Sequence, residues 1–157
     1  MRHVVSIVAV VPFATMVPSG AEAASIRACS LLDKELVEQV SPYDKQALDL
    51  VLKVPPNEDA AGQAGSQCDY GGITLAVDAF SPGAFDQMRE RDRTWMPVGG
   101  LGDRAYFRDN KARWGELYVV AGSRVLSIQM AVPTGRTAAS IQPNAVALAK
   151  AVLPRLR

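Results

Sequence analysis

The segment that most strongly constrains the fold reads as two β-strands joined by a tight turn. Apolar residues occupy every second position from Leu126 to Val132, which is the period of a strand with one buried face. A Gly-Ser pair at 122–123 can supply the backbone geometry of a two-residue hairpin turn. We therefore predict an antiparallel hairpin with arms at 113–121 and 124–132.

Capping residues and prolines mark the other expected elements. The predicted helix N-caps are Ser30, Ser41, Ser81 and Ser140, with Asp33 completing a capping box after Ser30. We expect helices over 31–40, from Pro42 to Pro55, from Pro82 onward and over 141–153, and further strands over 67–70, 73–80 and 104–108. Glycines at 71–72 leave open whether 67–80 is two strands or one bulged strand. The polar, Gly/Ala-rich stretch 57–66 predicts a mobile loop.

The arrangement of these elements indicates an α+β fold. Strands follow one another in hairpins and helices occur in separate blocks, a pattern typical of antiparallel sheets. We expect a sheet of about four to five strands with helices packed mainly on one face. The domain organisation is a leader at 1–23 followed by one domain at 24–157.

Residues 1–23 predict a cleavable signal peptide. Arg2 gives a positive start, residues 4–17 are almost all apolar, and small residues at Ala21 and Ala23 form an A-x-A site. The apolar run is about 14 residues, shorter than the roughly 20 that a membrane span needs. We expect cleavage after Ala23, a periplasmic or secreted mature protein, and no transmembrane span in the mature chain.

Cys29 and Cys68 are the two cysteines of the chain and lie 39 positions apart. An even number of cysteines in an exported chain favours a disulfide. Two free buried thiols and a lipidated Cys29 are the alternatives. Arg27 stands where a lipidation box requires a small residue, which argues against the second alternative.

The mature chain is expected to lack several common chemistries. The one histidine is His3, which lies in the predicted leader, so a mature chain has no imidazole for Ser-His-Asp or Cys-His catalysis or for histidine-ligated zinc. A net charge of +1 argues against nucleic-acid binding. We therefore expect no cofactor, no metal and no enzymatic activity.

Basic and aromatic side chains gather between positions 95 and 114, beside a glycine cluster. The candidate binding residues are Trp95, Gly100, Gly102, Asp103, Arg104, Tyr106, Arg108 and Trp114. Such a surface could hold a protein or an anionic envelope component such as a lipid head group or a wall polymer. The alternatives are a solvated helix face above core aromatics, and glycines that only need positive φ.

Two acids could in principle carry hydrolysis. Asp103 and Glu116 are flanked by glycine and aromatic residues, and two carboxyl groups held roughly 5–10 Å apart can cleave glycosidic bonds. The alternative is a turn cap for Asp103 and a solvated strand position for Glu116. A carboxylate-dependent wall-glycan hydrolase is therefore the enzymatic hypothesis.

Short motifs in a fixed order resemble a known class of protein. They are Cys29-x-Leu31-Leu32-x-x-Glu35, Cys68-x-Tyr70, Val98-x-Gly100-Leu101-Gly102-Asp103-x-Ala105-Tyr106 and Leu117-x-Val119-x-x-Gly122. Together they resemble the small two-cysteine cell-envelope domains of bacteria, many of them lipoproteins of unknown function. The resemblance implies a Cys29–Cys68 disulfide and a PsbP-like α+β fold used for binding rather than chemistry.

These observations favour an exported, non-enzymatic binding module of the cell envelope that contacts its partner through 95–114. An inhibitor or immunity-type protein that blocks a partner enzyme is the alternative from another class. The hydrolase is the third hypothesis.

Overall fold

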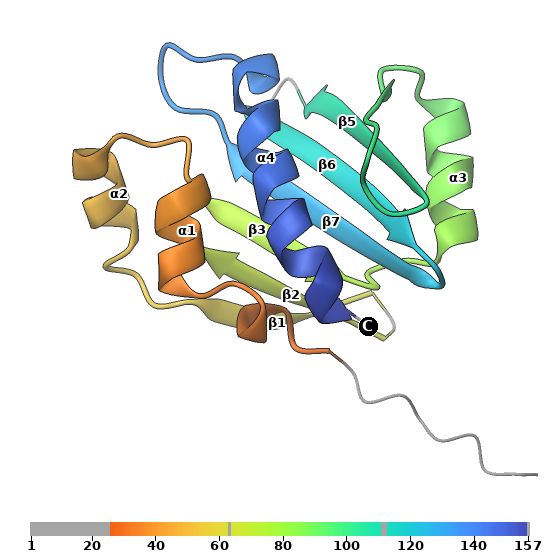
Figure 1. Ribbon diagram of the computed structural model, residues 1–157, viewed down its shortest axis with the longest axis horizontal. Helices are drawn as coiled ribbons and strands as arrows, with labels where there is room; N and C mark the ends of the chain where they lie inside the picture. Colours follow the sequence, from red (N-terminus) through yellow and green to blue (C-terminus); the bar gives the residue numbers. More distant parts are fainter. Residues whose placement is uncertain (1–25, 63, 111–112, 157) are drawn as a thin grey trace, which may run out of the picture.

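A single antiparallel sheet of seven strands forms the centre of the computed structural model, which describes residues 26–62, 64–110 and 113–156 (Figure 1). The strands are β1 (Asn57–Ala61), β2 (Gly65–Tyr70), β3 (Ile73–Val77), β4 (Met96–Pro97), β5 (Arg104–Asn110), β6 (Trp114–Ala121) and β7 (Arg124–Ala131). They lie in the order β1-β2-β3-β7-β6-β5-β4. The α+β class and the antiparallel sheet are thus confirmed, whereas the predicted signal peptide lies outside the described residues.

In the described residues, four α-helices and two 3₁₀-helices accompany the sheet. They are η1 (Ala28–Ser30), α1 (Lys34–Val40), α2 (Lys45–Val51), α3 (Pro82–Arg91), α4 (Ala138–Val152) and η2 (Leu153–Leu156). No helix of the described ranges has the length and apolar character that crossing a bilayer requires.

The sheet has more strands than the sequence indicated. The expectation of four to five strands is wrong because β1 and the two-residue β4 are added at the two edges. The predicted mobile loop over 57–66 is also wrong, since its first half is β1, paired residue for residue with β2. An edge strand that is largely exposed needs no apolar alternation, so β1 carried no periodic signal.

Glycines lie in the two-residue turns between β2 and β3 and between β6 and β7. Gly71 and Gly72 have φ of 60° and 77°, as a type I′ hairpin requires, so 67–80 contains two strands, β2 and β3, and not one bulged strand. Gly122, with φ of 61°, turns β6 into β7 and confirms the predicted hairpin.

Helix starts differ from the predicted ones where a better cap lies downstream. The carboxylate of Asp33 accepts from Leu36 N, so α1 begins after Asp33 and not after Ser30. The carboxylate of Asp44 likewise caps α2 in place of Ser41. Thr137 caps α4, with Ser140 as the third helical residue of a capping box. Ser81 caps α3 as predicted.

The two faces of the sheet are covered unequally. On one face, α1, α2 and α4 pack against the alternate apolar residues of β3, β5, β6 and β7 and form the main core. On the opposite face lies α3, which packs at the β5–β6 end through Phe85 (Figure 1). None of the other helices in the described part of the chain covers the β1–β2–β3 part of this second face.

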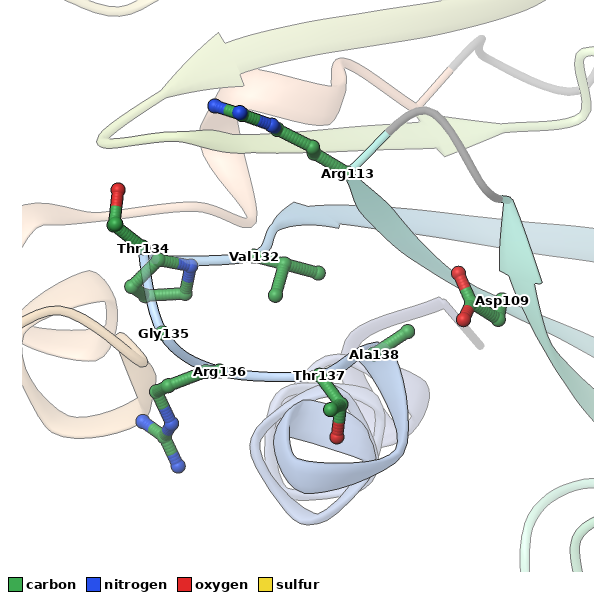
Figure 2. Close-up of a pocket in the computed structure, with 9 residues that line it drawn as sticks. Asp109, Arg113, Val132, Thr134, Gly135, Arg136, Thr137 and Ala138 are labelled. Carbon is green, nitrogen blue, oxygen red and sulfur yellow. The ribbon is translucent and has the colours of Figure 1, made fainter.

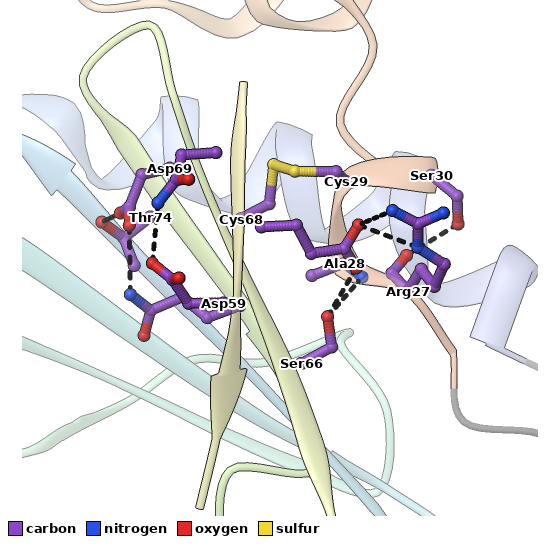
Figure 3. The surroundings of a disulfide bond; sticks show 12 residues. Arg27, Ala28, Cys29, Ser30, Asp59, Ser66, Cys68, Asp69 and Thr74 are labelled. Carbon is purple, nitrogen blue, oxygen red and sulfur yellow. Dashed lines mark hydrogen bonds and ion pairs between the residues drawn. A yellow bond between two sulfur atoms is a disulfide. The ribbon is translucent and has the colours of Figure 1, made fainter. Parts of the chain in front are cut away.

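A disulfide joins the N-terminal turn to the sheet (Figure 3). Cys29 in η1 is bonded to Cys68 in β2, with the two Cα atoms 4.9 Å apart, which confirms the predicted pairing. Ala28 N donates to Ser66 Oγ at 3.0 Å, and Ser66 Oγ donates to Glu58 Oε1 at 2.7 Å. Hydrogen bonds therefore hold η1 against β1 and β2 beside the covalent link.

Candidate functional site

The eight candidate binding residues do not form one surface. Trp95, Arg104, Tyr106 and Arg108 lie beneath or beside α3. Gly100, Gly102 and Asp103 line a depression at one end of the sheet. Trp114 lines a separate depression at the other end of the sheet, next to the turn between β2 and β3.

Trp95 belongs to a second, smaller core rather than to an exposed surface. Its side chain is 7% exposed and packs edge-on against Tyr118, with ring centroids 4.9 Å apart. Phe85 of α3 stacks on the same Tyr118 at 5.3 Å. Burial raises the pKa of Tyr118 above its ordinary value. These rings fix α3 to the sheet and are not available to a ligand.

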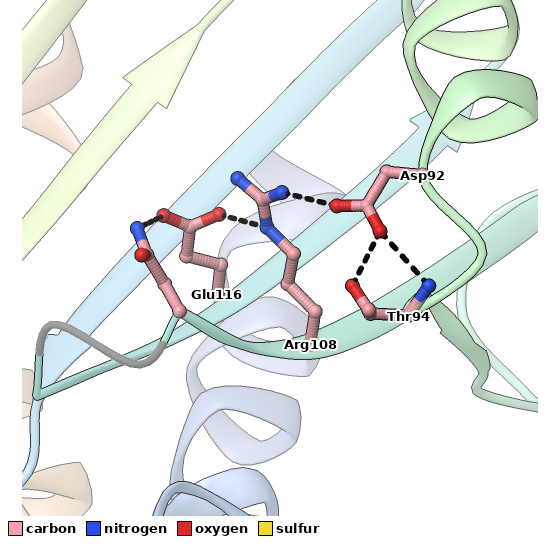
Figure 4. A network of polar contacts seen from close by, with 5 residues as sticks. Asp92, Thr94, Arg108 and Glu116 are labelled. Carbon is pink, nitrogen blue, oxygen red and sulfur yellow. Dashed lines mark hydrogen bonds and ion pairs between the residues drawn. The ribbon is translucent and has the colours of Figure 1, made fainter.

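Each of the two central arginines is already paired. Arg104 forms a two-point contact with Asp86 of α3, at 2.7 and 3.1 Å. Arg108 donates to Glu116 and to Asp92, both at 2.7 Å (Figure 4). Because these positive charges are compensated internally, they offer little attraction to an anionic ligand.

Glu116 lies at the centre of a network that ties α3 to the sheet. Its side chain is 2% exposed, and its carboxylate accepts from Arg108 and Asn110. The hydrogen bond from the Thr94 hydroxyl is the main cause that lowers the pKa of Asp92, and Arg108 adds to it. Burial opposes the charge of Arg108, but its two carboxylate partners outweigh this and raise its pKa.

The two acids of the hydrolase hypothesis are not brought together. Arg104 pairs with Val120 and Arg108 with Glu116, so Asp103 and Glu116 are about five residues apart along adjacent strands. At about 3.3 Å per residue this is on the order of 15 Å, beyond the roughly 5–10 Å that glycoside hydrolysis uses. The carboxylate of Asp103 also accepts from Gly122 N at 2.7 Å, as a turn-stabilising residue does.

The glycine cluster before β5 has a backbone role. Gly100 and Gly102 have φ of 77° and 53°. A Cβ at Gly102 would lie 2.4 Å from the carbonyl oxygen of Val120, whereas a Cβ at Gly100 would meet nothing within 4 Å. The loop therefore needs glycine at 102 for close packing on β6 and at 100 for its backbone angle alone.

This difference predicts unequal effects of two matched substitutions. Gly102→Ala should lower the free energy of unfolding by about 3 kcal/mol, because strain and overpacking add. Gly100→Ala should lower the free energy of unfolding by about 1 kcal/mol, because only the positive φ is unfavourable for alanine there. Urea unfolding followed by circular dichroism measures both. Equal losses in the two variants would contradict the packing role of Gly102.

Two depressions at the ends of α4 contain charged groups but no organised site. The depression of about 670 Å³ at the glycine cluster includes Lys150 and Arg124, and Arg124 is paired with Asp78. The other, of about 460 Å³, includes Arg113 and Arg136. Figure 2 shows these two arginines pointing away from each other, and Arg136 donates to the carbonyl of Pro42 at 2.8 Å. Neither arrangement clamps an anion.

A polar surface that sequence reasoning missed covers the helix-free part of the second face. We call it the open face, and it consists of Asn57, Asp59, Gln67, Asp69, Thr74 and Gln129. Four of these residues lie opposite one another across β1, β2, β3 and β7 in a single row. Figure 3 shows Asp59, Asp69 and Thr74 on one side of the β1–β2 pair and Cys29 on the other.

The two acids of the open face contact only neutral donors in the described structure. Asn57 donates to Asp59 at 2.7 Å, and Asp69 accepts from Gln67 and Thr74. Neither forms an ion pair with any lysine or arginine within 26–62, 64–110 and 113–156. As far as the described residues show, the open face thus carries two carboxylates without a cationic partner. No local sequence pattern indicates this face, because the mostly exposed residues of β1 lack apolar alternation.

Trp114 is the one candidate binding residue that lies at the margin of this face. It begins β6, pairs with Ala131 of β7 and is half-buried. Together with Asp69 and Thr74 it lines a depression of about 280 Å³. The tertiary structure therefore joins Trp114 to the open face and separates it from Trp95.

Within the described ranges, no three histidine, cysteine or acidic side chains gather as metal ligands would. No protein-family model matches this chain, and comparisons with curated proteins and with solved structures found no similar protein.

Proposed function

We propose that this chain is an exported, non-enzymatic binding module of the cell envelope whose partner is a protein with a basic contact surface. The open face is its contact surface. The observation that carries this proposal is the pair of carboxylates, Asp59 and Asp69, that have only neutral hydrogen-bond donors around them.

Charge and shape both support a protein partner. Asn57 and Asp59 are exposed, and Gln67, Asp69, Thr74 and Gln129 are partly exposed, so the face offers hydrogen-bonding groups over four strands. Uncompensated negative charge attracts a positively charged surface and increases the rate of association. The two arginines nominated for binding an anionic lipid or wall polymer are paired within the protein, Arg104 with Asp86 and Arg108 with Asp92 and Glu116.

The N-terminal sequence and the cysteines support export. A leader of the kind at 1–23 directs a chain out of the cytoplasm, and disulfides such as Cys29–Cys68 persist in oxidising compartments. The resemblance to small two-cysteine envelope domains agrees with this location.

The proposal predicts that binding depends on the charge of the open face. We expect Asn57→Lys/Asp59→Lys to lose at least tenfold in affinity for its partner, because like charges then face each other. Glu38→Lys/Gln39→Lys is the matched control, since both residues are exposed on α1, on the other side of the sheet, and the charge change is the same. Quantitative pull-down from the native envelope fraction measures the loss, and binding of the purified candidate partner confirms it.

Three outcomes are decisive. The proposal is supported if Asn57→Lys/Asp59→Lys recovers less partner protein and Glu38→Lys/Gln39→Lys recovers as much as the unsubstituted protein. High salt should also weaken recovery by the unsubstituted protein. Equal recovery by both variants contradicts it, as does binding to anionic vesicles or wall polymer in place of protein. If the recovered protein is an enzyme, its activity with and without the module tests the inhibitor role directly.

A further inference from the structure

The depression beside Trp114 has the composition of a pocket for one long cationic side chain. Three apolar residues from the end of α2 and the connection to β1, namely Val51, Val54 and Pro55, form one wall. Trp114 lines it from β6, and the Gly71–Gly72 turn closes one end. We call this depression the Trp114 pocket.

Among the described residues that line the Trp114 pocket, Asp69 alone is charged. Thr74 Oγ1 donates to Asp69 Oδ1, and Gln67 Nε2 donates to Asp69 Oδ2 at 3.1 Å. These neutral donors orient the carboxylate, and no lysine or arginine of the described residues pairs with it. Each oxygen retains acceptor capacity for a further donor.

An apolar wall, an indole ring and one carboxylate together suit a lysine side chain. Its four methylene groups can lie on Val54, which is 66% exposed, while the ammonium group reaches a carboxylate. A cation near an indole face gains a further attraction. The compact ammonium, with three donors that rotate freely, adapts to a carboxylate that already accepts two hydrogen bonds better than a rigid guanidinium fork does.

The pocket is small. Its volume of about 280 Å³ lies at the lower end of the roughly 300–1,000 Å³ typical of ligand pockets, and one long side chain fits within it. Apolar side chains that remain exposed at its rim, such as Val54, would be covered by the partner that carries the lysine.

We infer that the Trp114 pocket receives a lysine side chain of the basic protein partner. This inference rests on the proposed function and names the chemical group that the partner inserts. Asp69 pairs with the ammonium group, and Trp114 and Val54 contact the alkyl chain.

The two tryptophans provide an internal control for a direct test. The chain has two tryptophans, of which Trp95 is buried in the second core and Trp114 lines the pocket. Titration with Nα-acetyl-lysine amide, followed by the two indole N–H signals in a ¹⁵N-correlation spectrum, should shift Trp114 and leave Trp95 in place. Nα-acetyl-norleucine amide, which has a similar alkyl chain but no charge, should bind about tenfold more weakly.

Variants separate the contributions of the pocket residues. Asp69→Asn keeps the shape of the side chain and should remove the preference for lysine over norleucine. Asp59→Asn, on the adjacent edge strand and outside the pocket, is the matched control and should retain the preference. An unchanged Trp95 signal in each variant shows that the fold is intact.

Four other results would overturn the inference. They are equal binding of norleucine and lysine amides, no shift with either, a stronger shift with Nα-acetyl-arginine amide, and a preference for lysine that persists in Asp69→Asn. None of these results decides the proposed function. The pull-down with Asn57→Lys/Asp59→Lys decides it, because those two positions lie in β1 and outside the pocket. Conversely, lysine binding together with charge-insensitive pull-down would overturn the proposed function alone.

Discussion

Cys29→Ala/Cys68→Ala is expected to lower the free energy of unfolding by about 4 kcal/mol. The disulfide closes a loop of 39 residues, and the chain-entropy estimate for that length gives this value. Single domains have about 5–15 kcal/mol of stability, so a loss of this size removes a large fraction of the total. Urea unfolding of the oxidised protein and of the variant, followed by circular dichroism, measures the difference.

Reduction of the unsubstituted protein provides the control. Adding a thiol reductant should reproduce most of the loss, and the variant should not respond to it. The oxidised protein should be two hydrogens lighter than its reduced form by intact mass. A loss below about 1 kcal/mol, or two alkylatable thiols in denatured, non-reduced protein, would contradict the stabilising role of the bond.

Arg108→Ala is expected to lower the free energy of unfolding by about 3 kcal/mol. The substitution leaves the Glu116 carboxylate, 2% exposed, without its cation, and removing one partner of a buried ion pair is strongly destabilising. It also removes the hydrogen bond from Arg108 to Asp92, one of the contacts between the end of α3 and the sheet. Thermal and urea unfolding should show the loss.

A second arginine on the same strand serves as the matched control. Arg104 pairs with Asp86, but both side chains are more than a third exposed, so Arg104→Ala should cost below about 1 kcal/mol. Arg108→Met/Glu116→Leu should recover much of the stability lost in Arg108→Ala, because no unpaired charge remains buried. Equal losses for the two alanine variants would show that Glu116 is not held by Arg108.

The elements with strong local signals were predictable. Alternation from Leu126 to Met130 predicted β7, and Gly122 predicted the turn between β6 and β7. The glycines at 71–72 indicated either a turn or a bulge, and the structure shows the turn. Ser81 and Pro82 gave the start of α3. Edge strand β1 was not predictable, because its residues are mostly exposed and its hydrogen bonds come from β2.

Helix starts were predicted less well than helix existence. Ser30 and Asp33 are both acceptable N-caps, and nothing local indicates that Cys29 is bonded within a 3₁₀ turn and that the helix begins later. Two acceptable N-caps also lie close together before α2 and α4. The structure uses Asp44 instead of Ser41 for α2 and Thr137 instead of Ser140 for α4.

The sequence by itself determined the class of fold, the turn at Gly122, the cysteines available for pairing and the absence of histidine beyond His3. Only the tertiary structure decided which candidate residues could meet a partner. Trp95 and Trp114 look equivalent in the sequence, but one is packed beneath α3 and the other lines a depression together with Asp69, 45 positions earlier in the chain. Asp69 is in β2 and Trp114 is in β6, and the sheet places only β3 and β7 between those two strands. Contacts of this kind depend on hydrogen bonding between distant segments, which no local pattern of residues encodes.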